Sequence, residues 1–244
     1  MLLLIDAGNT TVKFAVPSGK TLRIIKAVPT ELFSSEEVGS LLKVFKVCVF
    51  CSVVPSVTKI IRDACRKRKI KMFQPTYKDI KDIKIKYKKP SRLGGDRLAA
   101  LKGALGRFRP PFIVIDIGTA VTCEIVNVRR EYLGGVIFPG IEMSMSALAE
   151  KTALLGRPRR RFRRIESAAG RNTAQCISRG VFNSIAGGIE KTVKDFIALH
   201  PRARILMTGI GLRHFRRRDF SFRFVKDEVL VFKGLLQFYK SCYN

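Results

Sequence analysis

Several features that carry function in other proteins are scarce or missing in this sequence of 244 residues. It has only two histidines, His200 and His214, which stand apart from other metal-ligating residues and which we interpret as structural. No apolar run approaches the roughly 18 residues that a membrane helix needs. The first residues lead directly to Asp6, without the basic region and long apolar stretch of a signal peptide. We therefore expect a soluble, cytoplasmic protein with no membrane partner.

The six cysteines lack the spacing of a metal cluster. Cys48 and Cys51 form a Cys-x-x-Cys pair, but no second pair or histidine cluster accompanies them. They lie in the apolar run 47–54, which is typical of a buried strand, where positions three apart point to opposite faces. We predict buried structural cysteines.

Acidic residues are also scarce: the sequence has 19 of them and 47 lysines and arginines, so the formal net charge is +28. The densest basic runs are 157–164, in a loop 156–164 predicted to be exposed, and 216–218. One interpretation is nucleic-acid binding through phosphates. The other is a solvated cationic exterior that attracts anionic substrates. We favour the second, because the basic residues are spread along the chain without a nucleic-acid-binding motif.

One short phrase is present twice, as LLIDAGNT at residues 3–10 and IVIDIGTA at residues 113–120. Each copy is an apolar strand that delivers an aspartate, Asp6 or Asp116, and a glycine to a tight turn. A glycine without a Cβ lets backbone N–H groups approach an anion, and a carboxylate beside them can hold a cation. Two copies favour two similar half-molecules facing one polyphosphate, although two ordinary β-hairpins would also give the pattern.

The order of the predicted elements supports a duplicated α/β architecture, because three strands, a helix, a strand and a helix occur twice. Paired prolines in the segment 107–111 predict a hinge, so we place one domain at residues 1–109 and the other at 110–244. The predicted strands are 2–6, 11–16, 21–27, 46–54, 112–117, 120–128, 131–137 and 203–208; the predicted helices are 35–44, 56–68, about 96–106, 140–152, 173–199 and 229–240.

A second candidate site is the phrase Leu93-Gly-Gly-Asp-Arg97. Gly94 and Gly95 permit a sharp turn, and Asp96 at the start of a helix is favoured in its charged form. Such a carboxylate suits phosphoryl transfer as a base, and Arg97 could clamp a substrate carboxylate at two points. From spacing alone, a helix cap and a surface charge explain these residues equally well.

These phrases together resemble the type III pantothenate kinases, a family with the actin-like ATPase (ribonuclease H-like) fold. That fold has two similar domains, each with a mixed sheet flanked by helices. The Gly-x-Asp-Arg and Gly-Gly-x-Ile-x-Pro-Gly phrases set the family apart from other actin-like kinases. The matching stretches, in family order, are Asp6–Thr10, Tyr87–Arg97, Asp116–Ala120, Gly134–Gly140, Gly170–Thr173 and Thr208-Gly209.

The resemblance implies transfer of the ATP γ-phosphate to the 4′-hydroxyl of pantothenate, with ATP, Mg²⁺, and K⁺ or NH₄⁺ as cofactors, by a homodimer. It makes Asp96 the catalytic base and Asp116 the ligand of the monovalent cation. Asp6 would hold Mg²⁺ through water. The other implied ATP-binding residues are Ala7, Gly8, Asn9, Thr10, Thr11, Val12, Lys13 and Thr119, and the implied pantothenate-binding residues are Tyr87, Gly94, Gly95, Asp96, Arg97 and Thr173.

Three departures from the family pattern keep other functions open. Lys89 replaces an asparagine of the substrate loop, Ile210 replaces a glycine where adenosine packs, and the high charge is not a family feature. A regulatory protein that has lost catalysis, a nucleic-acid-binding protein and another small-molecule kinase are the alternatives. Thr173 opens a predicted helix, where it could bind an anion or serve as a plain cap.

Overall fold

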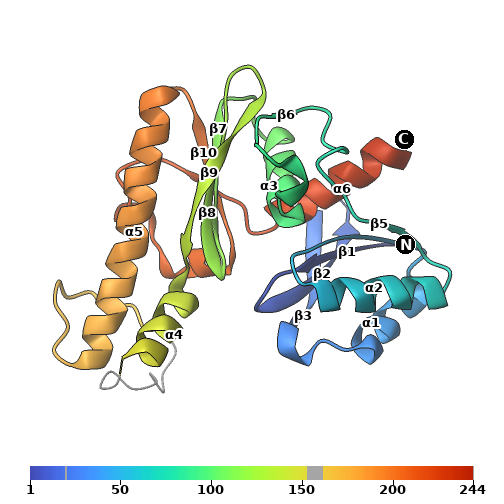
Figure 1. The fold of residues 1–244 in the computed structure, drawn as a ribbon, viewed down its shortest axis with the longest axis horizontal. Helices are drawn as coiled ribbons and strands as arrows, with labels where there is room; N and C mark the ends of the chain where they lie inside the picture. Colours follow the sequence, from blue (N-terminus) through green and yellow to red (C-terminus); the bar gives the residue numbers. More distant parts are fainter. Residues whose placement is uncertain (20, 153–161, 244) are drawn as a thin grey trace. The chain divides into compact units, whose positions relative to one another are not determined.

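A computed structural model describes residues 1–19, 21–152 and 162–243, so most of the predicted basic loop 156–164 lies outside the described residues. The chain divides into two compact units (Figure 1). Unit 1 contains Met1–Arg109, Arg130–Tyr132 and Val229–Asn244, and unit 2 contains Pro110–Arg129 and Leu133–Glu228. The chain thus first leaves unit 1 after Arg109, and two later segments return to it.

Unit 1 is built on a mixed sheet with the strand order β3-β2-β1-β4-β5. Its central strand β1 pairs antiparallel with β2 and parallel with β4. Alternation along β2, where Val12 and Phe14 are buried, fixes which face of the strand meets the core. The strands are β1 (Leu2–Ala7), β2 (Thr11–Ser18), β3 (Thr21–Pro29), β4 (Val47–Ser52) and β5 (Lys71–Phe73).

Helices α1 (Ser35–Leu41) and α2 (Pro55–Lys67) pack on one face of this sheet in a common apolar cluster. Helices α3 (Gly95–Leu105) and α6 (Leu230–Tyr243) pack on each other and against the central strands. Their backbones approach closely, because a Cβ on Gly103 would lie 2.4 Å from the Leu230 carbonyl oxygen. A Cβ on Gly234 would lie 1.8 Å from the Ala99 carbonyl oxygen. Only glycine allows this crossing.

Unit 2 repeats the arrangement in a sheet with the strand order β11-β10-β7-β8-β9-β6, of which the short β6 (Lys84–Ile85) belongs to unit 1. Here β7 pairs antiparallel with β8 and parallel with β10. The strands are β7 (Phe112–Ile117), β8 (Ala120–Val126), β9 (Glu131–Pro139), β10 (Arg204–Thr208) and β11 (Val225–Lys226). The hairpin-then-parallel order is the one seen in unit 1, so the predicted duplicated α/β fold with two mixed sheets is confirmed.

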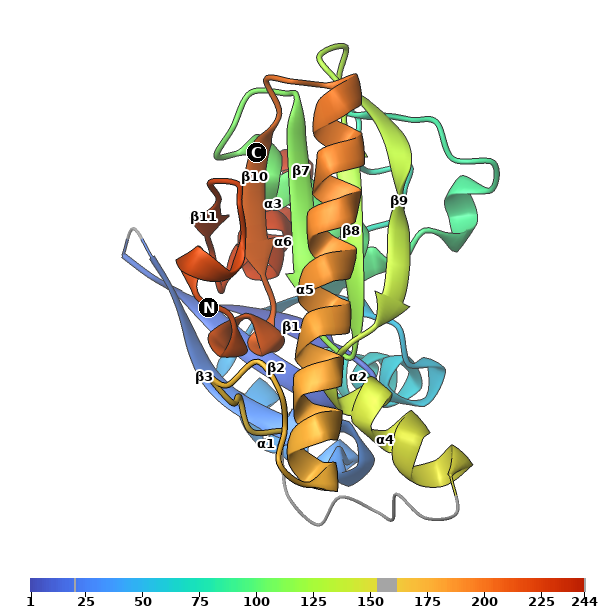
Figure 2. The same ribbon diagram turned by 90° about the vertical axis from the view of Figure 1, so that its left-hand side faces the viewer.

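Two helices cover the unit 2 sheet, α4 (Ile141–Lys151) and the long α5 (Thr173–Leu199), which runs along the strands in Figure 2. Helix α5 continues through two adjacent glycines. A Cβ on Gly188 would lie 3.3 Å from the Phe138 ring, whereas one on Gly187 would meet nothing within 4 Å. Close packing therefore explains Gly188 but not Gly187.

The remaining elements are short. Strand β6 (Lys84–Ile85) pairs parallel with Glu131 and Tyr132, the two residues of β9 that belong to unit 1. The 3-10 helices are η1 (Thr30–Leu32), η2 (Leu42–Val44), η3 (Pro90–Arg92), η4 (Ile210–His214) and η5 (Arg217–Asp219). None of the described helices is both long enough and apolar enough to cross a bilayer.

The predicted long elements are present within a few residues of their expected ends, and the short strands β5, β6 and β11 were not predicted. Strands of two or three residues are too short to show an alternating pattern. Cys48 and Cys51 are buried free thiols, as predicted. Helix α6, placed by sequence in a contiguous second domain, packs with unit 1, because its glycine-containing face fits α3.

Candidate active site

The first repeated phrase forms a tight turn between β1 and β2. The Gly8 N–H donates to the Thr11 carbonyl oxygen at 3.1 Å. The Thr30 hydroxyl donates to the Gly8 carbonyl oxygen at 2.7 Å, which ties the turn to the end of β3. Asn9 and Thr10 are exposed at its tip. The turn is therefore held from within the protein while its tip faces solvent.

Asp6 lies near the end of β1, between two cross-strand neighbours. Lys13 of β2 is its partner on one side and Cys51 of β4 on the other, so all three side chains leave the sheet on the same face. The Cys51 thiol donates to Asp6 Oδ1 at 3.5 Å. Cys51 was predicted to be only a buried structural residue, and the structure places it against the first candidate carboxylate.

The charges around Asp6 show that Asp96 is close to it. Burial raises the pKa of Asp6 above its ordinary value, the Lys13 charge acts to lower it, and the Asp96 charge raises it further. The pKa of the Cys51 thiol is raised well above its ordinary value, first by burial and then by the charges of Asp6 and Asp96. Cys51 is therefore a neutral donor beside two carboxylates that repel each other.

The start of α3 brings Asp96 to this place. The Arg97 N–H donates to Asp96 Oδ1 at 2.8 Å, which fixes the carboxylate at the first turn of the helix. A Cβ on Gly94 would lie 2.4 Å from the same oxygen, and one on Gly95 would lie 3.1 Å from the Cβ of Cys51. Gly94 thus leaves room for the Asp96 carboxylate, and Gly95 permits the close approach of α3 to β4.

Arg97, the next residue, is held by two tyrosines of unit 1. Its Nη2 donates to the Tyr132 hydroxyl at 2.6 Å, and its guanidinium carbon lies 5.8 Å from the ring centre of Tyr87. The two tyrosine ring centres are 6.1 Å apart. The structure therefore brings the predicted residues Tyr87 and Arg97 together. Sequence reasoning missed Tyr132, because nothing in the spacing links it to a residue 35 positions earlier.

The second repeated phrase forms the corresponding turn of unit 2. The Gly118 N–H donates to the Ala120 carbonyl oxygen at 3.1 Å, and the Gly140 N–H donates to the Thr119 carbonyl oxygen at 2.9 Å. Gly140 ends the Gly-Gly-x-Ile-x-Pro-Gly phrase, and a Cβ there would lie 2.2 Å from the Gly118 carbonyl oxygen. The end of the Gly-Gly-x-Ile-x-Pro-Gly phrase thus packs directly on the backbone of the second repeated phrase.

Asp116, at the end of β7, packs against the segment that follows β10. Gly209 has a φ of +93°, and a Cβ there would lie 2.3 Å from Asp116 Oδ1. A Cβ on Gly211 would lie 2.6 Å from the Ile117 side chain. Ile210, between these glycines, is 52% exposed. The departure from the family pattern therefore falls on an exposed side chain, and both close-approach positions remain glycine.

Thr173 is the first residue of α5 and is exposed. The cap of this helix is Asn172, whose side chain accepts from the Gln175 N–H at 3.0 Å. The interpretation of Thr173 as a plain cap is therefore wrong, because the neighbouring asparagine already satisfies the free N–H group. Lys89, the other departure in the substrate loop, is exposed just before η3.

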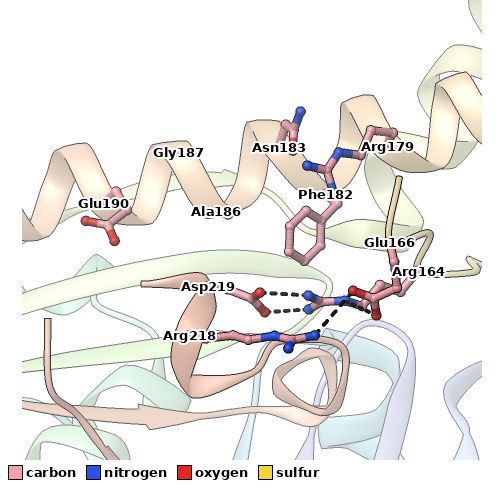
Figure 3. Close-up of a pocket in the computed structure, with 10 residues that line it drawn as sticks. All are labelled: Arg164, Glu166, Arg179, Phe182, Asn183, Ala186, Gly187, Glu190, Arg218 and Asp219. Carbon is pink, nitrogen blue, oxygen red and sulfur yellow. Dashed lines mark hydrogen bonds and ion pairs between the residues drawn. The ribbon is translucent and has the colours of Figure 1, made fainter. Parts of the chain in front are cut away.

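The arginine-rich segments of unit 2 meet at a pocket of about 450 Å³ along α5 (Figure 3). Arg164 donates to both carboxylate oxygens of Asp219, to one of them at 2.7 Å, and lies 4.7 Å from the centre of the Phe182 ring. Its side chain is only 15% exposed, so the prediction of an exposed loop is wrong at this residue. Glu166 pairs with Arg218 at 3.4 Å.

The lining of this pocket is electrically balanced. Three arginines stand against three acidic residues, and Glu166 pairs with both Arg216 and Arg218 of the basic run 216–218. These arginines therefore stabilise unit 2 internally, which weakens the nucleic-acid interpretation of that segment. The lining residues are Arg164, Glu166, Arg179, Phe182, Asn183, Ala186, Gly187, Glu190, Arg218 and Asp219.

The chain is similar to known proteins over most of its length. A family model described as type III pantothenate kinase matches residues 2–195. The chain belongs to the type III pantothenate kinase family. A type III pantothenate kinase of Persephonella marina is 32% identical over 257 aligned positions, which cover 98% of each chain. One from Brevibacillus brevis is 31% identical, again over 98% of each chain.

Solved structures show the same fold at lower identity. A Campylobacter jejuni protein assigned to the Baf family of transcriptional activators is 21% identical, with a TM-score of 0.64 over 98% of each chain. A 2-dehydro-3-deoxygalactonokinase-like protein of Sinorhizobium meliloti is 10% identical, with a TM-score of 0.57 over 100% of this chain and 99% of the other. The protein therefore has the predicted actin-like ATPase fold. The two solved structures share this fold, and the likeness concerns the fold alone.

Proposed function

We propose that this protein phosphorylates the 4′-hydroxyl of pantothenate with ATP, the first step of coenzyme A synthesis. Membership of the family supports this activity, and one structural observation carries it. Asp6 at the end of β1 and Asp96 at the start of α3 are close enough for the charge of Asp96 to raise the pKa of Asp6. Two carboxylates held together by glycine contacts suit the reacting end of a phosphotransferase.

Asp96 is the proposed base toward the acceptor hydroxyl. The Arg97 N–H orients its carboxylate, and Gly94 leaves room for it. The transition state of phosphoryl transfer is loose, so the orientation of the acceptor counts for more than the strength of the base. A carboxylate held at a helix start supplies that orientation without needing a high basicity.

Asp6 and the turn 6–13 are the proposed site for the ATP phosphates and Mg²⁺. The residues fit a divalent cation, because a positive ion beside Asp6 would relieve its repulsion with Asp96. Mg²⁺ commonly keeps several waters, which agrees with so few carboxylates. When bound, the ion would neutralise phosphate charge. The turn residues Ala7, Gly8, Asn9, Thr10, Thr11, Val12 and Lys13 would surround the phosphates.

Asp116 is the proposed ligand for a monovalent cation, K⁺ or NH₄⁺, and Thr119 the proposed contact to ATP. These two proposals are supported by the turn itself, because Gly140 and Gly209 lie so close to the neighbouring backbone that a Cβ on either would collide with it. Carbonyl oxygens and a carboxylate at such a crossing are the ligands that a weakly hydrated cation accepts.

Pantothenate would lie with its hydroxyl toward Asp96 and its carboxylate toward Arg97. Tyr87, Gly94 and Gly95 would line its path, and a role of Thr173 in pantothenate binding stays a prediction. We also propose a homodimer, for which the open Gly187 position on α5 offers a contact surface, and a cytoplasmic location, where ATP is available as the donor.

One coupled assay tests the proposal: ADP release is measured in K⁺ buffer with Mg²⁺, with and without pantothenate. We expect turnover that depends on pantothenate. Asp96→Asn should keep the fold and ATP binding but lower kcat by about 10²- to 10⁴-fold, the usual contribution of a general base. ADP release that ignores pantothenate would favour another small-molecule kinase, and no release at all would favour the regulatory alternative.

A further inference from the structure

Tyr132 is a buried tyrosine whose hydroxyl meets the candidate substrate clamp. The side chain is 0% exposed, and its hydroxyl accepts a hydrogen bond from Arg97 Nη2 at 2.6 Å. A buried tyrosine hydroxyl needs a hydrogen-bonding partner, and a charged donor gives a stronger bond than a neutral one. The contact therefore fixes one edge of the Arg97 guanidinium from inside the protein.

The backbone of Tyr132 is fixed as firmly as its side chain. Tyr132 is paired with Ile85 of β6, and its carbonyl oxygen accepts from the Lys86 N–H at 3.0 Å. Tyr87 lies two residues after the end of β6, and its ring lies beside both Tyr132 and Arg97. One short strand pair thus braces both aromatic partners of Arg97.

A braced guanidinium has a specific use. Arginine binds a carboxylate best when its planar fork is already oriented, because less side-chain rotamer entropy is then lost on binding. Arg97 follows Asp96 directly on the first turn of α3, so its orientation relative to the base decides which end of a substrate is recognised.

We propose that Tyr132 is a positioning residue that orients Arg97 to recognise the carboxylate of the substrate. The inference rests on the proposed function and goes beyond it, because it assigns the selection of a carboxylate-bearing substrate to a residue outside the substrate loop. Tyr132 itself touches no substrate in this proposal.

The test replaces Tyr132 by phenylalanine, which keeps the ring and removes the hydroxyl. Loss of a hydrogen bond to a charged group should raise KM for pantothenate about tenfold and leave kcat within about twofold. Pantetheine has an amide in place of the carboxylate, so its KM should change less than about twofold in Tyr132→Phe. The matched control is Tyr77→Phe, since the Tyr77 hydroxyl has no hydrogen-bonding partner among the described residues and its loss should change neither KM.

A double-mutant comparison separates positioning from a general structural effect. In an Arg97→Gln background, Tyr132→Phe should cause no further rise of KM for pantothenate, because the group it orients is gone. Equal KM changes for pantothenate and pantetheine, or additive effects with Arg97→Gln, would overturn the inference while leaving the kinase function intact. A wild-type protein that phosphorylates neither compound would refute the proposed function, and the inference with it.

Discussion

Replacing Gly94 by alanine should damage catalysis without damaging the fold. Gly94 has φ −58° and ψ 143°, a conformation that any residue adopts, so alanine brings no backbone strain. The added Cβ would lie 2.4 Å from Asp96 Oδ1, and its next contact, with Val53 Cγ1 at 3.7 Å, is ordinary. The conflict therefore falls almost entirely on the proposed catalytic carboxylate, which must rotate away from its N–H partner.

The two expected magnitudes differ widely. A displacement of about 1 Å of a reacting group costs about 10²-fold in rate, so kcat for pantothenate should fall by about that factor. Stability should change by less than about 0.5 kcal/mol. Alanine is a poorer cap than glycine by a few tenths of a kcal/mol, whereas it lowers the entropy of the unfolded chain by a similar amount.

The assay measures ADP release together with unfolding in urea. Gly180→Ala is the matched control, because Gly180 lies within α5 and a Cβ there would meet nothing within 4 Å. That variant should keep full turnover and gain up to about 1 kcal/mol of stability from helix propensity. Wild-type turnover in Gly94→Ala would refute the reasoning, since Asp96 would then tolerate a change of position. A large loss of stability would refute the assignment of the conflict to a side chain.

Three further outcomes follow from the same contacts. Cys51→Ala removes the thiol that lowers the pKa of Asp6, so the acid limb of the kcat/KM profile should move to higher pH. An unchanged acid limb would show that Cys51 has no effect on the pKa of Asp6. Turnover should collapse when K⁺ and NH₄⁺ are replaced by Na⁺, and equal rates in all three salts would count against a cation site at Asp116. Asp219→Asn should cost about 3 kcal/mol of unfolding free energy, because it removes the charged partner that accepts from both Nη atoms of the largely buried Arg164. Because Arg164 lowers the pKa of Asp219, the ion pair should stabilise the wild-type protein above about pH 4, and this stabilisation should be lost as the pH falls further. Acid unfolding of both proteins would measure the difference.

The fold was largely predictable from the sequence because its strongest signals are local. The repeated phrase places Asp6 and Asp116 at strand ends, and the order of elements around each copy gives the same sheet in both units. The glycine phrase before Asp96 also locates the start of α3 to within one residue. The repeated phrase and the glycine phrase each lie within a dozen residues of chain.

The contacts that complete the candidate site were not predictable, because they join distant positions. Cys51 reaches Asp6 through the register of two parallel strands 45 residues apart, and an apolar run does not reveal that register. Tyr132 reaches Arg97 because the first two residues of β9 belong to unit 1. The burial of Arg164 depends on Asp219, which a run of basic residues cannot indicate.

The return of α6 to unit 1 has a consequence for biosynthesis. Residues 230–243 supply the surface against which Ala99 and Gly103 of α3 pack, yet more than a hundred residues of chain separate them. During translation, the amino-terminal sheet can form early, but α3 keeps an uncovered apolar side until the ribosome has released α6. The proposed base Asp96, carried by that helix, reaches its working position only at this late stage.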